Sequence, residues 1–378
     1  MRFSLDFAGL AALCGAQGLN FTAVAEAAID AMNNAFYSPA DGRWSPGDAW
    51  WPSGVALTSV VDYMRKTGSG QYLSYDHRII QAQRAPLPWW PHGAGEFRAQ
   101  TTDDTAWWAL AMVRMYDLTG SREYLDIALK DEAYMYQNWT DADCQGGIYN
   151  AIANELYIKL AASLYNRLKG QQGAEYLLAR AERAWFWFRE SGMINSDNLV
   201  NDGLVKGEDA LCYNNKLPVW TYNQGVILGG LNSTSPRKTP DYLSAAQQIA
   251  DAVLSSSGLT SPGTGTLTEQ ACEPAGTCNG DQQLFKGIFA ANLAELAAAT
   301  VAANDHRKRE TQRQNRYRDY LARNAESAYA NARAVVPGAG DCYGLSWAGP
   351  GPGPYDGTGT GKTLSKQASA VALFVGLI

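Results

Sequence analysis

One pattern recurs along the chain and constrains its fold more than any other feature. An apolar helical stretch is followed by a polar turn, and a Tyr-Leu pair then opens a second helical stretch, as in "LTSVVDYMRKTGSGQYLSYDHRII" and "LAMVRMYDLTGSREYLDIALK". A repeat of about 50 residues made of two helices indicates stacked helical hairpins. The pairs that mark the copies begin at Tyr72, Tyr124, Tyr176, Tyr242 and Tyr320.

The number of copies favours a closed arrangement. With further helices expected near 21–36 and 363–376, the chain holds about six hairpins. Such hairpins form an open solenoid or a closed ring. We expect the ring, an all-α (α/α)6 toroid or barrel of helical hairpins, because it buries both ends of the repeat and gathers long loops over one mouth. We find no alternating run that predicts a sheet and no low-complexity linker, so we expect a single domain over residues 19–378.

Composition argues against several classes of function. The formal net charge is −6, and the basic cluster at 305–318 is diluted by Asp, Glu and Gln. We interpret it as a solvated helix face and expect no nucleic-acid partner. The few histidines show no zinc-ligand spacing, so we expect neither a metal nor a cofactor. In "DGTGTGKT", Asp356 stands where a phosphate loop needs its first glycine, which argues against nucleotide binding.

The N-terminus favours secretion. Residues 1–18 contain one Arg, a short apolar run and small residues near Ala16–Gly18, as a signal peptide does. The apolar stretch at 364–378 is too short to span a bilayer. It is either a tail removed on lipid anchoring or, as we expect, a final core helix, which favours a freely secreted protein. Three sequons fit a secreted glycoprotein; they begin at Asn20, Asn138 and Asn232.

The cysteines predict one disulfide and leave the rest open. Cys14 would leave with the signal peptide. Cys272 and Cys278 lie six residues apart around a Pro/Gly turn, so we expect a local disulfide between them. The remaining three cannot all pair with one another, which leaves one thiol free: Cys144, Cys212 and Cys342.

Two adjacent aspartates head an apolar helix in "AQTTDDTAWWALAMVRMYDLTG", residues 99–120. Thr101 or Thr102 can cap the helix start, which places Asp103 and Asp104 in the first turn, where the helix dipole favours negative charge. A surface helix with two first-turn acids is one interpretation. Because the residues behind the pair are apolar on most sides, we instead expect an inner helix whose N-terminus opens into the mouth of the ring.

The separation of the two carboxyl groups suits glycoside hydrolysis. Retaining glycosidases use two carboxyl groups about 5–5.5 Å apart, which is roughly the separation of adjacent helical side chains. One carboxylate attacks the anomeric carbon of the sugar, and the other carboxyl group protonates the leaving oxygen. Close carboxylates split their pKa values, which supplies an anion and an acid at the same pH. Trp107 and Trp108 are candidates for an apolar wall that raises the pKa of the acid.

The chain also resembles glycoside hydrolase family 76, the fungal and bacterial endo-α-1,6-mannanases. The resemblance covers essentially the whole mature chain and implies an (α/α)6 barrel and a retaining mechanism. By position, it implies that Asp103 is the nucleophile and Asp104 the general acid/base. The resemblance rests on the segments "DDTAWWALA", "CQGGIYNAIANELYIKLAASLY", "VWTYNQGVILGGL", "LTEQACEPAGTCNGDQQLFKGIF" and "SKQASAVAL".

The same resemblance suggests contacts to substrate. Asn223 and Gln224 in "TYNQG", and Asp281 and Lys286 in "GDQQLFKGIF", stand at expected starts of inner helices, although Lys286 is equally a candidate for a structural ion pair. The segment before the aspartates, "GAGEFRAQTT", lacks the Asn and Tyr usual in the family, which leaves the sugar subsites open. Four aromatic residues are candidates for stacking on sugars or for packing in the core: Trp51, Trp107, Trp108 and Tyr149.

The sequence therefore predicts a secreted endo-α-1,6-mannanase that cleaves the mannan backbone with retention through a glycosyl-aspartate. Its expected partner is α-mannan or another mannose polysaccharide of the cell wall, and we expect a monomer. Two alternatives stay open. One is a transglycosylase acting on mannan or on lipid-anchor glycans, and the other is a non-catalytic glycan-binding barrel.

Overall fold

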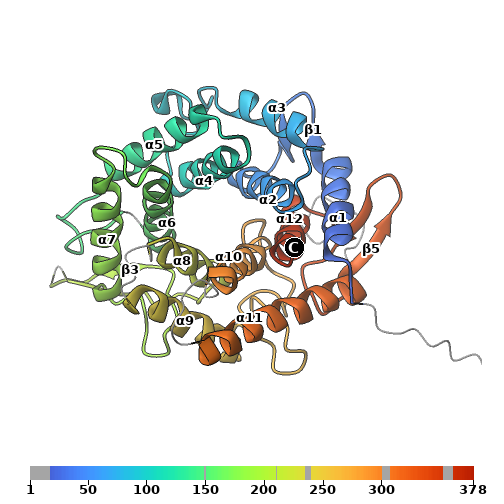
Figure 1. The fold of residues 1–378 in the computed structure, drawn as a ribbon. Helices are drawn as coiled ribbons and strands as arrows, with labels where there is room; N and C mark the ends of the chain where they lie inside the picture. Colours follow the sequence, from blue (N-terminus) through green and yellow to red (C-terminus); the bar gives the residue numbers. More distant parts are fainter. Residues whose placement is uncertain (1–17, 149, 210, 235–239, 300–306, 352–360) are drawn as a thin grey trace, which may run out of the picture.

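The helices of the chain form two concentric rings (Figure 1). The computed structural model describes residues 18–148, 150–209, 211–234, 240–299, 307–351 and 361–378. The inner ring consists of α2 (Trp51–Thr67), α4 (Thr102–Thr119), α6 (Ala151–Leu168), α8 (Thr221–Thr234), α10 (Phe285–Ala299) and α12 (Leu364–Gly376). The outer ring consists of α1 (Phe21–Phe36), α3 (Leu73–Gln83), α5 (Arg122–Tyr136), α7 (Glu175–Glu190), α9 (Pro240–Ser255) and α11 (Arg307–Ser327).

Contacts between neighbouring helices close the ring. Each inner helix packs against the next one along the chain, and α12 packs against α2. The outer helices α3, α5, α7, α9 and α11 pack against the inner helices that precede them, while α1 packs against α12. The closed (α/α)6 barrel expected from the repeat is therefore confirmed. Among the described residues, no helix combines the length and the apolar character needed to cross a membrane.

The Tyr-Leu pairs mark outer helices, as the repeat predicted, with one exception. Tyr72, Tyr124 and Tyr176 lie within two residues of the start of α3, α5 and α7, and Tyr242 lies in the first turn of α9. Tyr320 instead lies well inside α11, so the fifth copy was placed wrongly at its helix start. The described part of the basic cluster, residues 307–318, forms the first turns of this longer helix, and most of its described side chains are exposed, as expected.

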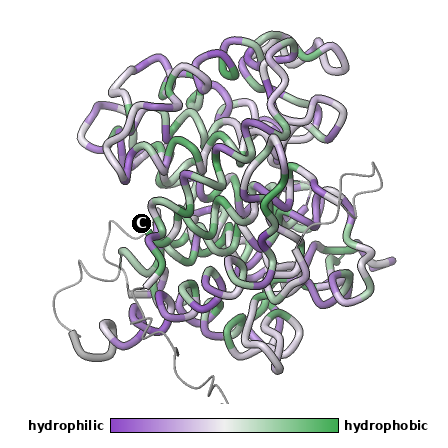
Figure 2. The backbone as a smooth tube through the Cα atoms, turned by 90° about the vertical axis from the view of Figure 1, so that its right-hand side faces the viewer, coloured by the Kyte–Doolittle hydropathy of each residue, from purple (hydrophilic) through white to green (hydrophobic). Residues whose placement is uncertain are grey.

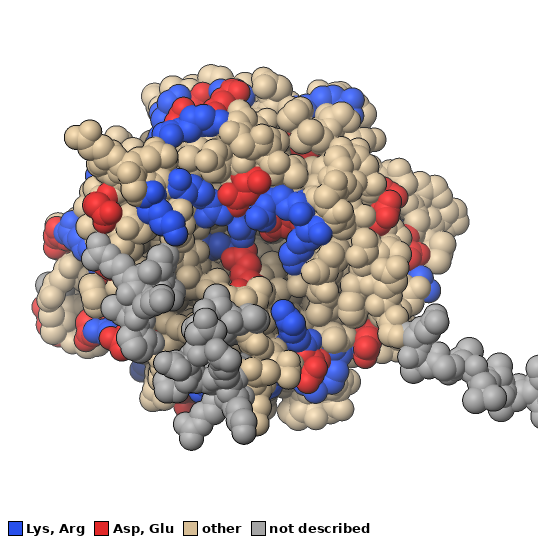
Figure 3. Space-filling model, viewed as in Figure 1, with Lys and Arg blue, Asp and Glu red and all other residues tan. Residues whose placement is uncertain are grey.

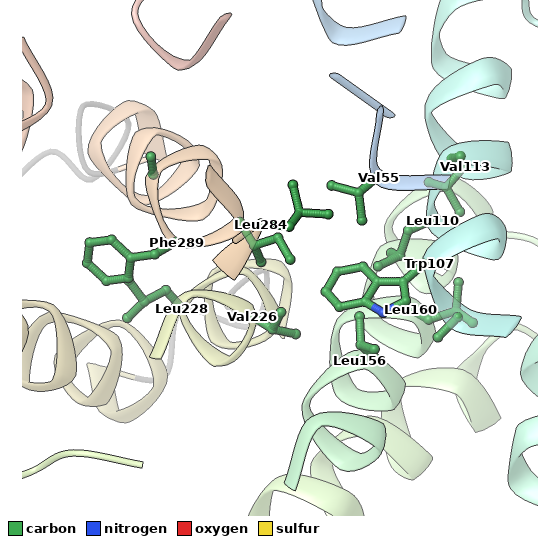
Figure 4. Packing of buried hydrophobic residues seen from close by; sticks show 14 of the residues in the cluster. Val55, Trp107, Leu110, Val113, Leu156, Leu160, Val226, Leu228, Leu284 and Phe289 are labelled. Carbon is green, nitrogen blue, oxygen red and sulfur yellow. The ribbon is translucent and has the colours of Figure 1, made fainter. Parts of the chain in front are cut away.

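The inner helices approach one another closely because glycines stand at their crossings. A side chain at Gly225 of α8 would collide with the backbone of Phe289 in α10, and one at Gly287 of α10 with the backbone of Ser369 in α12. Apolar side chains from α2, α4, α6 and α8 point toward the middle of the ring, among them Val55, Leu110 and Val226 (Figure 4). Seen from the side, the hydrophobic residues run through the middle of the molecule and the hydrophilic ones lie toward its outer turns (Figure 2).

The inner helices run parallel, so the barrel has two different mouths. We call the mouth at which they begin the N-terminal mouth; there Trp51, at the start of α2, donates to Asp281, just before α10. At the C-terminal mouth, where they end, Lys66 of α2 donates to the carbonyl of Val375 in α12 over 2.7 Å. Charged residues of both signs surround the hollow of this second face (Figure 3).

An ion-pair network stabilises the C-terminal mouth. Arg114 of α4 pairs with Glu295 of α10 and, at 3.5 Å, with Asp62 of α2, while the amine of Lys159 in α6 lies 3.4 Å from Glu295. The cations lower the pKa of Glu295 to about 2 although burial opposes this shift. These charges therefore tie four inner helices together at the end of the barrel away from the aspartate pair.

Short hairpins and disulfides complete the described part of the chain. Three two-stranded antiparallel sheets join β1 (Tyr37–Ser38) to β2 (Arg43–Trp44), β3 (Leu204–Lys206) to β4 (Cys212–Asn214), and β5 (Arg333–Val336) to β6 (Gly340–Tyr343). They were not predicted, because two to four residues are too few to show an alternating pattern. Disulfides join Cys272 to Cys278 and Cys144 to Cys212, and among the described cysteines the free thiol is the buried Cys342.

Candidate active site

Asp103 and Asp104 lie in the first turn of α4, and α4 is an inner helix, so both expectations for this helix are met by the structure. Both aspartates are half-buried. Thr101, one of the two expected residues, takes the N-cap position, but its side chain makes no capping hydrogen bond to the helix backbone. The start of α4 is held instead by Thr105, whose hydroxyl accepts from the backbone N–H of Ala99 over 2.9 Å.

The environment raises the pKa of both aspartates, in different ways. Burial is the main cause for Asp103, and hydrogen bonds from the backbone N–H groups of Asp103 and Asp104 oppose it. For Asp104, burial and the neighbouring charge of Asp103 raise the pKa to about 7, against a weaker opposing hydrogen bond from Thr101. Backbone N–H groups stabilise a carboxylate anion, whereas a neighbouring negative charge favours the protonated acid. The hydrogen bonds to Asp103 therefore favour its anionic form, while burial and the charge of Asp103 favour the protonated form of Asp104.

A third carboxylate adds to this effect. The charge of Asp281, in the turn that precedes α10, raises the pKa of both aspartates. Asp281 accepts a hydrogen bond of 2.9 Å from the indole N–H of Trp51. The ring of Trp51 stacks on Trp107 with centroids 5.4 Å apart, and both rings are largely buried. Trp51 and Trp107 thus form an apolar wall at the N-terminal mouth, and Trp107 also lines a second cavity of about 200 Å³ that reaches Arg114.

Asp103 lines a cavity of about 540 Å³. That volume lies within the range of about 300–1,000 Å³ that is usual for ligand pockets. The cavity extends from the start of α4 over the loop between α5 and α6. Its other polar or aromatic lining residues are Gln100, Thr101, Thr102, Asn138, Thr140, Asp143, Asn150 and Trp187.

One wall of this cavity, formed by Trp187 and the Gly146-Gly147 backbone, was missed in the sequence. Both glycines have positive φ, and a side chain on either would collide with the ring of Trp187. The indole N–H of Trp187 donates to the carbonyl of Cys144 over 2.9 Å, and the disulfide to Cys212 fixes the same loop to β4. The paired glycines of "CQGGIYN" were a signal of close backbone approach, but nothing in the sequence pointed to Trp187 in α7.

The segment before the aspartates has an unusual backbone. The residues Ala94 to Phe97 have consecutive positive φ angles of 57°, 82°, 52° and 64°, a left-handed conformation that non-glycine residues rarely adopt. Neighbouring groups hold them there, since Glu96 pairs with Arg84 at 2.9 Å and with Lys130 at 3.0 Å. The ring of Phe97 is fully buried and stacks on Trp108. The segment before the aspartates, which lacks the Asn and Tyr usual in the family, thus packs against α4 through the ring of Phe97.

Four expected substrate contacts are buried: Trp108, Asn223, Gln224 and Lys286. Trp108 is fully buried and stacks on both Trp50 and Phe97. The ammonium of Lys286 lies 2.8 Å from Glu273, and its side chain is 1% exposed. These residues therefore pack the barrel, which corrects the expectation that they contact sugars.

The buried amides of "TYNQG" need the same correction. Gln224 accepts from the backbone N–H of Val200 and donates to its carbonyl, each over 2.7 Å, so it fixes the loop after α7. Asn223 donates to the buried Glu155. Of the remaining candidates, Asp281, Trp51 and Trp107 lie together near the aspartate pair, while Tyr149 falls outside the described residues.

The family model for glycosyl hydrolase family 76 matches residues 20–378. The chain belongs to glycosyl hydrolase family 76. Among the curated relatives of this family member, the mannan endo-1,6-α-mannosidase DCW1 of Candida albicans is 25% identical over 297 residues, covering 70% of this chain and 62% of the relative. The mannan endo-1,6-α-mannosidase DFG5 of Saccharomyces cerevisiae is 24% identical over 314 residues, covering 76% of this chain and 65% of the relative. The chain thus spans slightly less than two thirds of the length of these relatives.

Solved structures of the family share the fold. An α-1,6-mannanase of Salegentibacter sp. HEL1_6 matches with a TM-score of 0.77 and 24% identity, over 95% of this chain and 99% of that one. An inactive variant of the same mannanase, with two consecutive aspartates replaced by alanine and α-1,6-mannotetrose bound, matches with a TM-score of 0.78, 22% identity and the same shares of the two chains.

Proposed function

We propose that this protein is an endo-acting α-1,6-mannanase that cleaves the mannan backbone with retention of anomeric configuration. The observation that carries the proposal is the pKa of about 7 for Asp104 directly beside Asp103, on the N-terminal turn of an inner helix. The bound α-1,6-mannotetrose in the Salegentibacter relative, and the inactivity of its variant lacking two consecutive aspartates, support the same assignment.

The first step uses the two aspartates in different protonation states. The carboxylate of Asp103 attacks the anomeric carbon and forms a glycosyl-aspartate ester, while Asp104 gives its proton to the oxygen of the breaking glycosidic bond. The backbone N–H groups at the start of α4 favour the anionic form of Asp103. Burial and the charge of Asp103 in turn hold the pKa of Asp104 at about 7, which favours its protonated form.

The second step reverses the roles. Once Asp103 is esterified, its charge no longer raises the pKa of Asp104, which now exists as a carboxylate. Asp104 takes a proton from water as the water oxygen attacks the anomeric carbon, and Asp103 leaves as a carboxylate. Two inversions at the same carbon give net retention.

We further propose that the protein acts outside the cell. Disulfides persist in oxidising compartments, and the two disulfides of this chain fit a secreted protein. The predicted signal peptide, residues 1–18, lies almost wholly outside the described residues.

The test is incubation with linear α-1,6-mannan, with product sizes and the anomeric configuration of the first product read by NMR. We expect internal cleavage and an α-configured product. Asp103→Asn and Asp104→Asn should each abolish turnover, while Asp126→Asn, on the exposed face of α5, should retain it. Near-normal activity of either active-site variant contradicts the proposal.

Azide separates the two roles. Asp104→Ala should still form the glycosyl-aspartate from a substrate with an activated leaving group, and azide should restore turnover with retained configuration. Asp103→Ala should give an azide product of inverted configuration. Added acceptor sugar distinguishes hydrolysis from transglycosylation, since a transglycosylase yields elongated glycans. Mannan binding without cleavage at any pH would support the non-catalytic barrel instead.

A further inference from the structure

The three sequons lie in very different surroundings. Asn232 is half-buried in the last turns of the inner helix α8, with its amide 3.5 Å from the carbonyl of Glu295. Asn20 is exposed, but its side chain caps α1 by accepting from the backbone N–H of Ala23. Asn138 is exposed in the turn after α5. Asn138 therefore combines an accessible amide with a position outside regular structure.

The Asn138 sequon belongs to the wall of the cavity that contains Asp103. Both its asparagine and its threonine, Asn138 and Thr140, line that cavity. Neither Asn20 nor Asn232 lines it. A group bonded to the amide of Asn138 must therefore begin at the rim of the cavity that Asp103, the proposed nucleophile, lines.

Neighbouring contacts hold this sequon in place. The backbone N–H of Asn138 donates to the carbonyl of Met135 over 3.0 Å, and the backbone N–H of Thr140 donates to the carbonyl of Gly147 over 3.1 Å. The ring of Trp139 packs edge-on against Trp187, with centroids 5.9 Å apart. Because the loop is fixed at both ends of the sequon, a group on Asn138 would stay beside the cavity and could not swing away with the backbone.

We propose that Asn138 carries an N-linked glycan, and that this glycan narrows the cavity and limits the length of mannan chain accepted on that side. The inference rests on the proposed function and on secretion. A lipid-diphosphate-linked oligosaccharide is the donor: the amide nitrogen of Asn138 bonds to the anomeric carbon of the first sugar, the amide loses one proton, and the lipid diphosphate leaves. The amide keeps one N–H, which can still donate to the carbonyl of Tyr134, now 3.2 Å away.

The first experiment measures occupancy. The full chain is produced in a secreting eukaryotic host and its glycopeptides are mapped by mass spectrometry. We expect a glycan on Asn138 that is lost in both Asn138→Gln and Thr140→Val. The matched control is Thr22→Val, which removes the Asn20 sequon while leaving the cap of Asn20 on α1 intact. An unmodified Asn138 overturns the inference.

The second experiment compares each protein with itself before and after enzymatic removal of N-glycans from the folded protein. Removal should raise kcat/KM on long mannan severalfold more than on a short α-1,6-mannooligosaccharide, for the wild type and for Thr22→Val. In Asn138→Gln and Thr140→Val, the same treatment should leave the ratio of kcat/KM on long mannan to kcat/KM on the short oligosaccharide unchanged. An unchanged ratio in the wild type, or an equal change in all four proteins, overturns the inference.

Failure of the proposed function would be seen separately. If no form cleaves mannan, affinity for a long and a short α-1,6-mannooligosaccharide, read by tryptophan fluorescence before and after glycan removal, still tests whether the glycan narrows the cavity. Occupancy is read by mass alone. Absence of cleavage thus rejects the proposed mannanase activity. An unglycosylated Asn138 or an unchanged chain-length preference rejects only the proposal that a glycan on Asn138 narrows the cavity.

Discussion

Asp104→Asn should make the folded protein more stable above neutral pH while removing its activity. In the wild type, burial and the charge of Asp103 hold the pKa of Asp104 at about 7, against 3.8 for an ordinary aspartate. The folded protein therefore binds this proton more tightly than the unfolded chain does. Stability that is present below the unfolded pKa is lost as the pH rises from about 4 through about 7. An asparagine does not titrate, so the variant avoids this loss.

The size of the effect follows from the pKa shift. The difference between about 7 and 3.8 corresponds to about 4 kcal/mol between the two protonation states. Because Asp104 is only half-buried, solvent screening reduces this figure, and we expect a gain of about 2 kcal/mol. The gain should be small at pH 4, where the carboxyl group is protonated in the folded state and only partly ionised in the unfolded state, and complete by pH 8.

Urea unfolding at several pH values between 4 and 8, followed by tryptophan fluorescence, measures the effect for the wild type and Asp104→Asn. Asp126→Asn is the control, since it removes one negative charge from a side chain that is 51% exposed on α5. We expect the free energy of unfolding of Asp104→Asn to exceed that of the wild type increasingly toward pH 8, with no comparable trend in the control. A gain that does not depend on pH, or a less stable variant at pH 8, would refute the raised pKa and the reasoning built on it.

Three further results are expected. The kcat/KM of the wild type on α-1,6-mannan should fall about tenfold from pH 6 to pH 8, because Asp104 must carry its proton in the first step; a flat profile would exclude Asp104 as the acid. Removing the disulfide between Cys144 and Cys212, which are 68 residues apart, should lower the free energy of unfolding by about 4 kcal/mol. Removing the other disulfide, whose cysteines are 6 residues apart, should lower it by about 2 kcal/mol, because a shorter loop restricts the unfolded chain less. Equal losses in urea unfolding would contradict this dependence on loop length. Glu295→Gln should lower the free energy of unfolding at pH 7 by about 3 kcal/mol, since it removes the carboxylate that pairs with both Arg114 and Lys159. That loss should shrink as the pH falls from about 4 toward about 2, the pKa of Glu295, and a loss that stays constant over this range would argue against the ion pairs.

The ring was predictable because its signal is repeated. Each hairpin must bury the same kinds of face, so each copy carries a similar pattern, and a poor copy such as the one at Tyr320 changes a boundary without changing the architecture. The apolar surroundings of "AWWALAMV" likewise indicated an inner helix, since an outer helix needs a polar face. The short hairpins had no such repetition and were missed.

The role of polar residues at the starts of inner helices was harder to predict. A buried amide such as Gln224, which bonds to a neighbouring loop, and an amide that faces a groove occupy similar sequence contexts. The same holds for the ammonium of Lys286, whose partner Glu273 lies in a preceding loop. Such a residue can be assigned to the core or to the cavity only when its distant partners are known, because burial and partners are tertiary properties.

By itself, the sequence determined the repeat, the inner position of α4 and the adjacency of Asp103 and Asp104, since each of these follows from local periodicity or from the covalent chain. Only the tertiary structure decided how strongly the pKa of the two aspartates is raised, because burial is the largest cause for both. Burial is the main cause that raises the pKa of Asp104 to about 7, and the charge of Asp281, brought in from the turn before α10, adds to it. The energy of a charge depends on its surroundings in space, and residues far apart in the chain supply most of those surroundings.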